Sequence, residues 1–179
     1  MITIREATYE DVDFLVEADM VTDGWTPGSE EESAAHREKI AAYTSGANER
    51  GWIAEDVETG AKAGVILVRF RDRYNEPDTE ANRFLHRFLD DSIFPADGRF
   101  CEVFLLWVAP AYRRQGLATR LKKKIEEESR KRGMRMIYTH TEASNEHVVE
   151  MNRKLGYQEV RRGPLWDAVP RVSLVKWLE

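Results

Sequence analysis

Apolar residues recur along the chain with two different periods, and the changes between these periods predict the order of strands and helices. Ile2 and Ile4 alternate with polar residues, as in a half-buried strand, whereas Val12, Leu15 and Val16 recur at helical spacing. The elements expected in the first part of the chain are a strand near residues 2–5, a helix between Thr8 and Trp25, a helix from the capping box of Ser29 and Glu32 to about Tyr43, and strands at 52–56 and 64–70.

The second part of the chain opens with a less regular stretch, residues 74–100. Phe84, Leu85, Phe88 and Leu89 form an apolar stripe there, which predicts a helix over residues 82–89. The elements expected after it are a very apolar strand at 102–108, a helix with the buried edge Leu117, Leu121 and Ile125 that stops at Gly133, a strand at 134–141, a helix at 145–155, and strands at 157–161 and 172–178.

Strands dominate both ends of this order and helices lie between them, so the pattern predicts an α+β fold with a mixed sheet covered by helices on both faces. The chain has 179 residues and contains no internal repeat, low-complexity tract or obvious linker. We therefore expect one domain over residues 1–179, with residues 74–100 as a helical insertion within it.

The composition of the chain argues against several classes of function and of site. The chain is 42% hydrophobic and 33% charged, with a net charge of −5, which argues against general nucleic-acid binding. No apolar run approaches the length of a membrane span, and the N-terminus lacks a signal-peptide pattern, so we expect a cytoplasmic protein without a membrane partner. Cys101 is the only cysteine, so an internal disulfide and a Cys-rich metal site are excluded.

Most candidate functional residues lie in the segment 103–118. Its pattern predicts a buried strand, a short turn and the first turn of a helix. The first N–H groups of a helix have no partner within the helix, and they carry partial positive charge. Gly116 allows the backbone to approach an anion closely, and Arg113 and Arg114 add full positive charge. The segment therefore predicts a ligand with a pyrophosphate.

Two motifs together resemble the GCN5-related N-acetyltransferase (GNAT) superfamily. Its acyl-CoA signature is Arg or Gln, two residues, Gly, one residue, and Gly or Ala, which Arg113, Gly116 and Ala118 match. Its second motif, Asn followed later by Lys-x-Gly-Phe/Tyr, is matched by Asn145 and by residues 154–157. The resemblance covers nearly the whole chain and implies a mostly antiparallel, twisted sheet of about seven strands in the order β-α-α-β-β-β-α-β-α-β-β.

The resemblance also implies a cosubstrate and the residues that bind it. The cosubstrate is acetyl-CoA, and no metal is involved. The strand before the signature pairs with pantetheine in this family, and the turn after it binds the phosphates. The residues assigned to acetyl-CoA on this basis are Leu106, Trp107, Val108, Arg113, Arg114, Gln115, Gly116, Leu117, Ala118, Thr119 and Asn145.

The activity implied is transfer of an acetyl group to a primary amine, of a small molecule or a protein, by direct attack on the thioester. Glu102 and His140 are the two candidates for the base that deprotonates the amine, because different members of the superfamily carry a base at one or the other position. Asn152 stands where many relatives carry a tyrosine that protonates the CoA sulfur, and an amide can only offer a hydrogen bond there.

Several alternatives remain open at this stage. The missing tyrosine fits a non-catalytic, acyl-CoA-binding regulatory protein, which is the rival to an enzyme. Lys122, Lys123 and Lys124 each lie four residues before a glutamate, as on a solvated helix face. This explains most of the basic residues between 113 and 132 without a nucleic-acid partner. The expected partners are acetyl-CoA and an amine acceptor, and the chain is expected to be a monomer or a homodimer.

Overall fold

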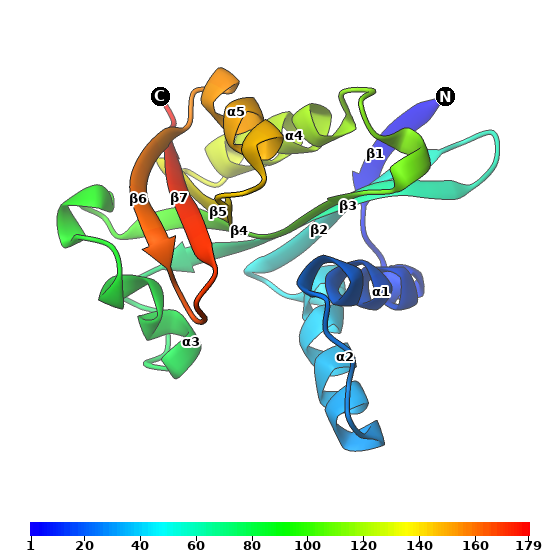
Figure 1. Ribbon diagram of the computed structural model, residues 1–179, viewed down its shortest axis with the longest axis horizontal. Coiled ribbons are helices and arrows are strands. Elements are labelled where there is room, and N and C mark those ends of the chain that lie inside the picture. Colours follow the sequence, from blue (N-terminus) through cyan, green and yellow to red (C-terminus); the bar gives the residue numbers. More distant parts are fainter. The chain divides into compact units, whose positions relative to one another are not determined.

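The computed structural model describes residues 1–179 and contains one seven-stranded sheet with the strand order β1-β2-β3-β4-β5-β7-β6 (Figure 1). β4 and β5 are parallel, whereas β1–β2, β2–β3, β5–β7 and β6–β7 are antiparallel. The predicted α+β class with a mixed sheet is confirmed. The main elements are β1 (Ile2–Glu6), α1 (Val12–Asp23), α2 (Glu30–Ser45), β2 (Glu49–Asp56), β3 (Ala61–Asp72), α3 (Glu80–Arg83), β4 (Arg99–Val108), α4 (Leu117–Lys131), β5 (Met136–Glu142), α5 (Glu146–Lys154), β6 (Gln158–Pro164) and β7 (Pro170–Trp177).

The helix predicted over residues 82–89 is wrong as a continuous element. α3 stops at Arg83 and a short 3-10 helix, Leu85–Arg87, follows it. In a continuous helix the carbonyl of Asn82 would accept a hydrogen bond from the N–H of His86, but here it accepts one from the Arg71 side chain at 2.7 Å. A tertiary contact therefore interrupts the helix that the apolar stripe predicts.

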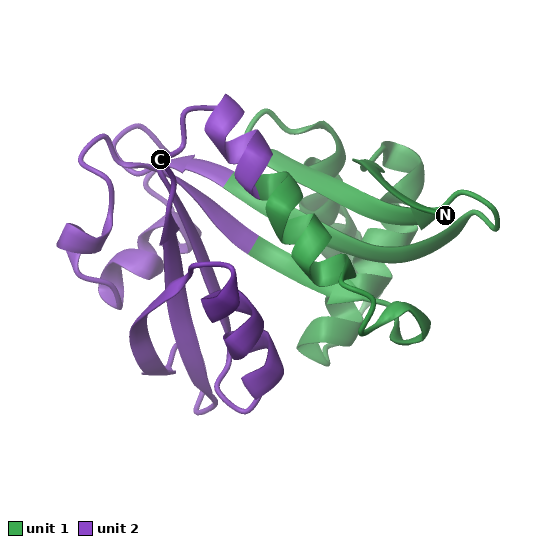
Figure 2. Cartoon of the chain, turned by 90° about the horizontal axis from the view of Figure 1, so that it is seen from above, with its two compact units in different colours: residues 1–69, 104–125 green, residues 70–103, 126–179 purple.

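The chain divides into two compact units, which Figure 2 shows in different colours. Unit 1 comprises residues 1–69 and 104–125, and unit 2 comprises residues 70–103 and 126–179. β3, β4 and α4 each contribute residues to both units. The single domain over residues 1–179 remains a prediction. None of the helices combines the length and the apolar character that crossing a membrane requires.

In unit 1, helices cover both faces of the sheet. Val65 and Leu67 of β3 pack in one cluster with residues of α1 and α2, among them Leu15 and Ile40, which are fully buried. Gly64 faces the other way, since side chains alternate along a strand, and a Cβ built on it would lie 3.5 Å from the Leu121 side chain of α4. α4 therefore covers the face opposite to α1 and α2.

In unit 2, the inserted segment supplies part of the core. Leu85, Leu89 and Phe94 are at most 5% exposed and pack with Phe100 of β4. Met136 and Tyr138 of β5 and Val175 of β7 complete this cluster. Because the segment buries its apolar side chains against three strands, it holds a fixed position on that part of the sheet.

Candidate active site

The loop between β4 and α4 presents backbone N–H groups at a helix start. Arg114 and Gly116 have positive φ angles of 61° and 77°, which turn the backbone into the left-handed region. Arg120 donates the first helical hydrogen bond, to the carbonyl of Gly116, at 3.0 Å. The N–H groups that precede Arg120 therefore lie at the open end of α4, where partial positive charge gathers.

The residues of this loop suit an anionic ligand such as a diphosphate. Residues 113–116 are exposed, and a Cβ built on Gly116 meets no atom within 4 Å, so the space beside the backbone is open. The Arg113 side chain donates a hydrogen bond to the carbonyl of Val108 at 3.0 Å, which ties the loop to the end of β4. Successive N–H groups in such a left-handed turn form a concave anion site.

The end of β4 runs very close to β3 in unit 1. The N–H of Ala109 donates to the carbonyl of Ala63 at 2.9 Å, and a Cβ on Gly64 would lie only 2.9 Å from the carbonyl oxygen of Trp107. A residue larger than glycine at position 64 would therefore displace this strand end. Leu106, Trp107 and Val108 are half-buried, so the strand end is partly open to solvent.

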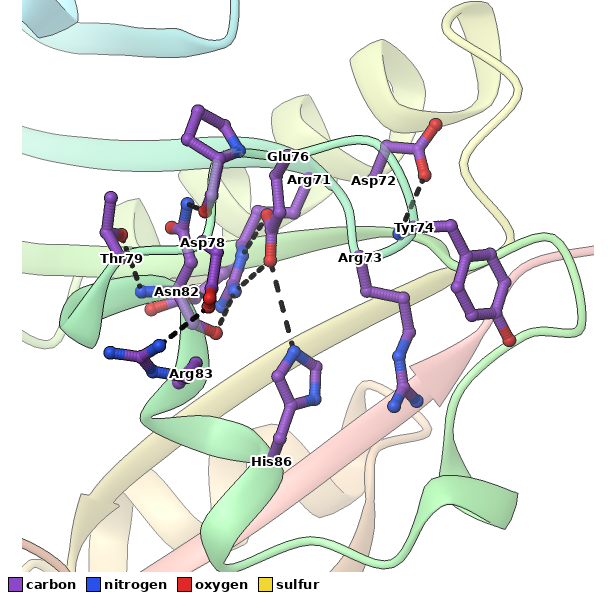
Figure 3. Close-up of polar contacts among 12 residues, drawn as sticks. Arg71, Asp72, Arg73, Tyr74, Glu76, Asp78, Thr79, Asn82, Arg83 and His86 are labelled. Atoms are coloured by element: carbon purple, nitrogen blue, oxygen red, sulfur yellow. Dashed lines mark hydrogen bonds and ion pairs between the residues drawn. The ribbon is translucent and has the colours of Figure 1, made fainter.

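Glu102 of β4 belongs to a buried ion-pair cluster in unit 2, centred on Arg71 of β3. Figure 3 shows Arg71 with two other members of this cluster, Glu76 and Asn82. The Arg71 guanidinium is 2% exposed and donates to Glu102 Oε2 at 2.7 Å and to Glu76 Oε2 at 3.0 Å. A further N–H donates to Glu76 Oε1 at 2.5 Å, and another to the Asn82 carbonyl at 2.7 Å. The guanidinium also lies over the Phe100 ring, 4.9 Å from its centroid. These contacts fix the position of the Glu102 carboxylate.

Burial of the guanidinium acts to lower the pKa of Arg71, but the hydrogen bonds to Glu76 and the charges of Glu102 and Glu76 raise it overall. Arg71 is therefore always charged. His86 lies 3.9 Å from Glu76, and its pKa is lowered by burial and by the charges of Arg73 and Arg71. The cluster thus brings the carboxyl groups of Glu76 and Glu102 to one guanidinium.

His140 of β5 lies in a hydrogen-bonded chain of unit 2. Its Nδ1 is 3.3 Å from the Tyr138 hydroxyl, which is 3.0 Å from Ser173 Oγ of β7. The Trp166 ring, in the β6–β7 turn, meets the imidazole edge to face with a centroid distance of 5.2 Å. Tyr138 and Ser173 are fully buried, while His140 is half-buried. The imidazole is thus held on two sides and still reaches solvent.

The structure places the two predicted bases on one face of the sheet. Glu102 pairs in register with Tyr138 across the parallel β4–β5 ladder, and His140 is two residues further along β5. Side chains two residues apart share a face, so Glu102, Tyr138 and His140 point the same way. The charge of Glu102 also raises the pKa of Tyr138, in addition to the larger effect of burial.

The remaining predicted site residues lie on α5 in unit 2. Asn145 is the N-cap residue of α5, but its side chain makes no capping hydrogen bond. Asn152 is 1% exposed, and its Oδ1 has no hydrogen-bond partner in the structure. Leaving a buried amide oxygen without a partner costs free energy. No group of three or more His, Cys, Asp or Glu side chains is arranged to hold a metal ion.

Sequence reasoning missed the residues that hold the two bases. Arg71 lies near the end of β3 and Glu76 lies in the irregular segment after it, and nothing in their spacing links them to Glu102. Tyr138 could have been found, because period-two alternation places it on the same face as His140. Ser173 could not, since its position depends on the pairing of β5 with β7.

Known proteins resemble the chain in sequence and in fold. The chain matches the acetyltransferase (GNAT) family over residues 17–157. Arabidopsis thaliana NAA60 in complex with acetyl-CoA has a TM-score of 0.71 at 18% identity, covering 99% of each chain. The Escherichia coli ribosomal-protein-S18-alanine N-acetyltransferase has a TM-score of 0.70 at 16% identity, covering 100% of this chain and 95% of that one.

The Vibrio cholerae spermidine/spermine N-acetyltransferase SpeG, solved in mutant forms, has a TM-score of 0.66 at 16% identity. The match covers 99% of this chain and 95% of the SpeG chain. No curated protein sequence matches the chain. The structural similarities show the fold, and the family match covers most of the chain, including the β4–α4 loop, both predicted bases and Asn152. The chain belongs to the acetyltransferase (GNAT) family.

Proposed function

We propose that this chain transfers an acetyl group from acetyl-CoA to a primary amine, with residues 1–179 acting as one acetyltransferase domain. The observation that carries the proposal is the shared face of Glu102 and His140 in unit 2. An amine arrives as ammonium and must lose a proton before it can attack a thioester. A fixed carboxylate beside a half-buried imidazole supplies both an attraction for the cation and a base for its proton.

Acetyl-CoA is the proposed cosubstrate. The N–H groups of residues 113–119, together with the exposed Arg113 and Arg114, would hold the pyrophosphate. The partly open strand end at residues 106–108 would pair with the pantetheine arm. Asn145 is assigned to the same ligand. Two solved structures with this fold, those of Arabidopsis thaliana NAA60 and Salmonella typhimurium yncA, were obtained with acetyl-CoA, which supports this choice of ligand.

The two candidate bases have different proposed roles. Arg71 binds one carboxylate oxygen of Glu102, so we assign to Glu102 the fixed negative charge that attracts the ammonium. We assign the proton to His140, because imidazole is the side chain best suited to accept and release a proton near neutral pH. Asn152 provides at most a neutral hydrogen bond near the leaving sulfur.

The proposed reaction conserves protons and electron pairs at each step. One N–H bond of the ammonium breaks and its proton moves to His140, which leaves a lone pair on nitrogen. That pair forms the C–N bond to the thioester carbonyl carbon, and the C–S bond then breaks with its electron pair on sulfur. A second proton leaves the nitrogen and ends on the thiolate. The products are the acetylated amine, CoA and the protonated imidazole, which returns its proton to solvent.

Turnover of acetyl-CoA tests the proposal. Thiol release is followed with a panel of small primary amines and short peptides that have an unblocked N-terminus. His140→Gln should lower kcat/KM by roughly 10² or more, with partial recovery at high pH where unprotonated amine accumulates. Glu102→Gln should mainly raise the KM for the amine.

The outcomes of this assay separate the alternatives. If both variants retain kcat/KM within about threefold at neutral pH, neither residue has the proposed role, because loss of a base costs at least about 10². If acetyl-CoA binds but no amine on the panel is acetylated, the chain is instead an acyl-CoA-binding regulatory protein, the alternative that Asn152 favours.

A further inference from the structure

Three aromatic side chains of unit 2, Trp166, Phe84 and Phe88, form a continuous row that begins beside His140. The Trp166 ring lies 5.2 Å from the imidazole, and the Phe84 ring lies 6.1 Å from Trp166, measured between centroids. Phe88 continues the row at 5.2 Å from Phe84. Trp166 is 54% exposed and both phenylalanines are half-buried, so this aromatic row is an apolar surface that solvent reaches.

Two segments that are distant in sequence supply the aromatic row and hold it in place. Phe84 follows directly after α3, which lies beside the β6–β7 turn that carries Trp166 (Figure 1). The guanidinium of Arg171 lies over the Trp166 ring, 3.7 Å from its centroid, and is itself paired with Asp167. Because these contacts already order the rings, a ligand that packs against them costs little side-chain entropy.

Arg161 of β6 places a positive charge at the far end of the aromatic row. Its guanidinium lies 5.0 Å from the Phe88 ring centroid and donates to two backbone carbonyls, which carry no net charge. Strand register puts Arg161 on the same face of the sheet as His140, because both pair with Ser173 of β7. The aromatic row therefore has the imidazole at one end and a fixed positive charge at the other.

We propose that the aromatic row selects the acceptor, which is a primary amine that carries an aromatic or large apolar group and no second positive charge. The inference rests on the proposed function for the place of the reacting nitrogen, beside Glu102 and His140. From there the remainder of the acceptor extends over Trp166 toward Phe84 and Phe88. A phenyl group on this surface is removed from water and packs edge to face or offset against the rings, as aromatic pairs prefer.

Diamines are disfavoured on the same surface. Ring faces attract cations, but the guanidinium groups of Arg161 and Arg171 already lie over Phe88 and Trp166. A second ammonium group on the acceptor would therefore meet positive charge along the aromatic row, and it would also lose part of its hydration.

Binding of 2-phenylethylamine tests the inference without turnover. NMR follows the indole N–H signals of the five tryptophans in the whole chain in the presence of CoA, and Trp166→Phe identifies the Trp166 signal. We expect 2-phenylethylamine to shift that signal, and butylamine and 1,4-diaminobutane at the same concentration to shift it less. The signal of Trp177, another exposed tryptophan of unit 2, should not move.

The turnover assay tests the apolar part of the selection. The kcat/KM for 2-phenylethylamine should exceed that for butylamine by about tenfold or more, because even one methylene group in an apolar pocket changes specificity by about tenfold or more. Trp166→Ala should reduce this ratio to roughly threefold or less, since it removes the ring that the phenyl group contacts first. Trp177→Ala removes an exposed ring at the other end of β7 and should leave the ratio unchanged.

Arg161→Gln tests the charge part of the selection. The ratio of kcat/KM for 1,4-diaminobutane to that for butylamine should rise roughly threefold or more, because the second ammonium group then meets one positive charge fewer. Arg162→Gln is the matched control: the next residue of β6 points to the opposite face and pairs with Glu159, so the ratio should not change.

The inference is overturned if 2-phenylethylamine leaves the Trp166 signal in place or if all three amines shift it equally. It is also overturned if 1,4-diaminobutane is the preferred acceptor, or if Trp166→Ala leaves the ratio of 2-phenylethylamine to butylamine unchanged. A failure of the proposed function would appear differently, as absence of acetylation of every amine. The NMR measurement would still decide in that case whether the aromatic row binds 2-phenylethylamine.

Discussion

Replacing Glu76 by glutamine tests whether the buried charges around Glu102 attract the amine. Glu76 and Glu102 together hold two negative charges against the one positive charge of Arg71, a net charge of −1. Glu76→Gln keeps the side-chain size and makes the cluster neutral. Arg71 then compensates Glu102 alone, so an ammonium ion beside Glu102 is attracted less strongly.

The size of this loss follows from Coulomb's law. Glu76 and Glu102 bind the same guanidinium at 2.5–3.0 Å, so an ammonium ion on the far side of Glu102 lies roughly 8 Å from Glu76. At an effective dielectric constant of about 20, one unit charge at that distance contributes about 2 kcal/mol. Since about 1.4 kcal/mol is a factor of ten, the KM for the amine should rise roughly 10–30-fold.

The assay measures kcat and both KM values for Glu76→Gln and for a control, Asp78→Asn. Asp78 makes an exposed ion pair with Arg83 in the same segment, with side chains 78% and 52% exposed, so its removal should leave all three values nearly unchanged. Glu76→Gln should change the KM for the amine and not the KM for acetyl-CoA. An unchanged amine KM in a folded Glu76→Gln chain would refute the electrostatic role of the cluster.

Three further predictions concern other sites. Acetyl-CoA at one hundred times its Kd should stabilise the chain by about 2.7 kcal/mol, a shift in Tm of several degrees that Gly116→Glu should abolish and Gly60→Glu, at another exposed position with positive φ, should retain. Asn152→Ala should slow turnover tenfold or less, because a neutral hydrogen bond contributes about 0.5–1.5 kcal/mol; a hundredfold loss with folding and CoA affinity intact would contradict this. The lowered pKa of His86 means that the unfolded chain binds more protons there than the folded chain, so stability should fall as pH drops below about 6.5, and the Tm of His86→Gln should fall less over that range.

Local patterns predicted most of the fold. Strand alternation, capping residues such as Ser29 and the glycine stop at Gly133 are properties of short segments, and the corresponding elements are present. The helix predicted over residues 82–89 was wrong because its interruption depends on Arg71, which lies more than ten residues away. No periodicity within a segment reports such a contact.

The part of the candidate site that lies within short segments was also predictable from the sequence. The motif residues of the β4–α4 loop are adjacent in sequence, so the motif can be recognised in a single sequence without an alignment. Glu102 and His140 were predicted as alternatives, and strand register shows that they share a face. The ion pair with Arg71, on which the proposed role of Glu102 rests, joins segments that are distant in sequence. The hydroxyl chain from Ser173 through Tyr138 to His140 does so too.

The most direct test of the central claim follows the acetyl group itself. The chain is mixed with acetyl-CoA that carries an isotopic label in its acetyl group and with each primary amine of the panel, and the amine products are separated and their label is measured. The account predicts label in an N-acetylated amine, in amounts equal to the CoA released, and none with Gly116→Glu. Thiol release with the label appearing only as acetate, or no transfer to any amine despite acetyl-CoA binding, would contradict it.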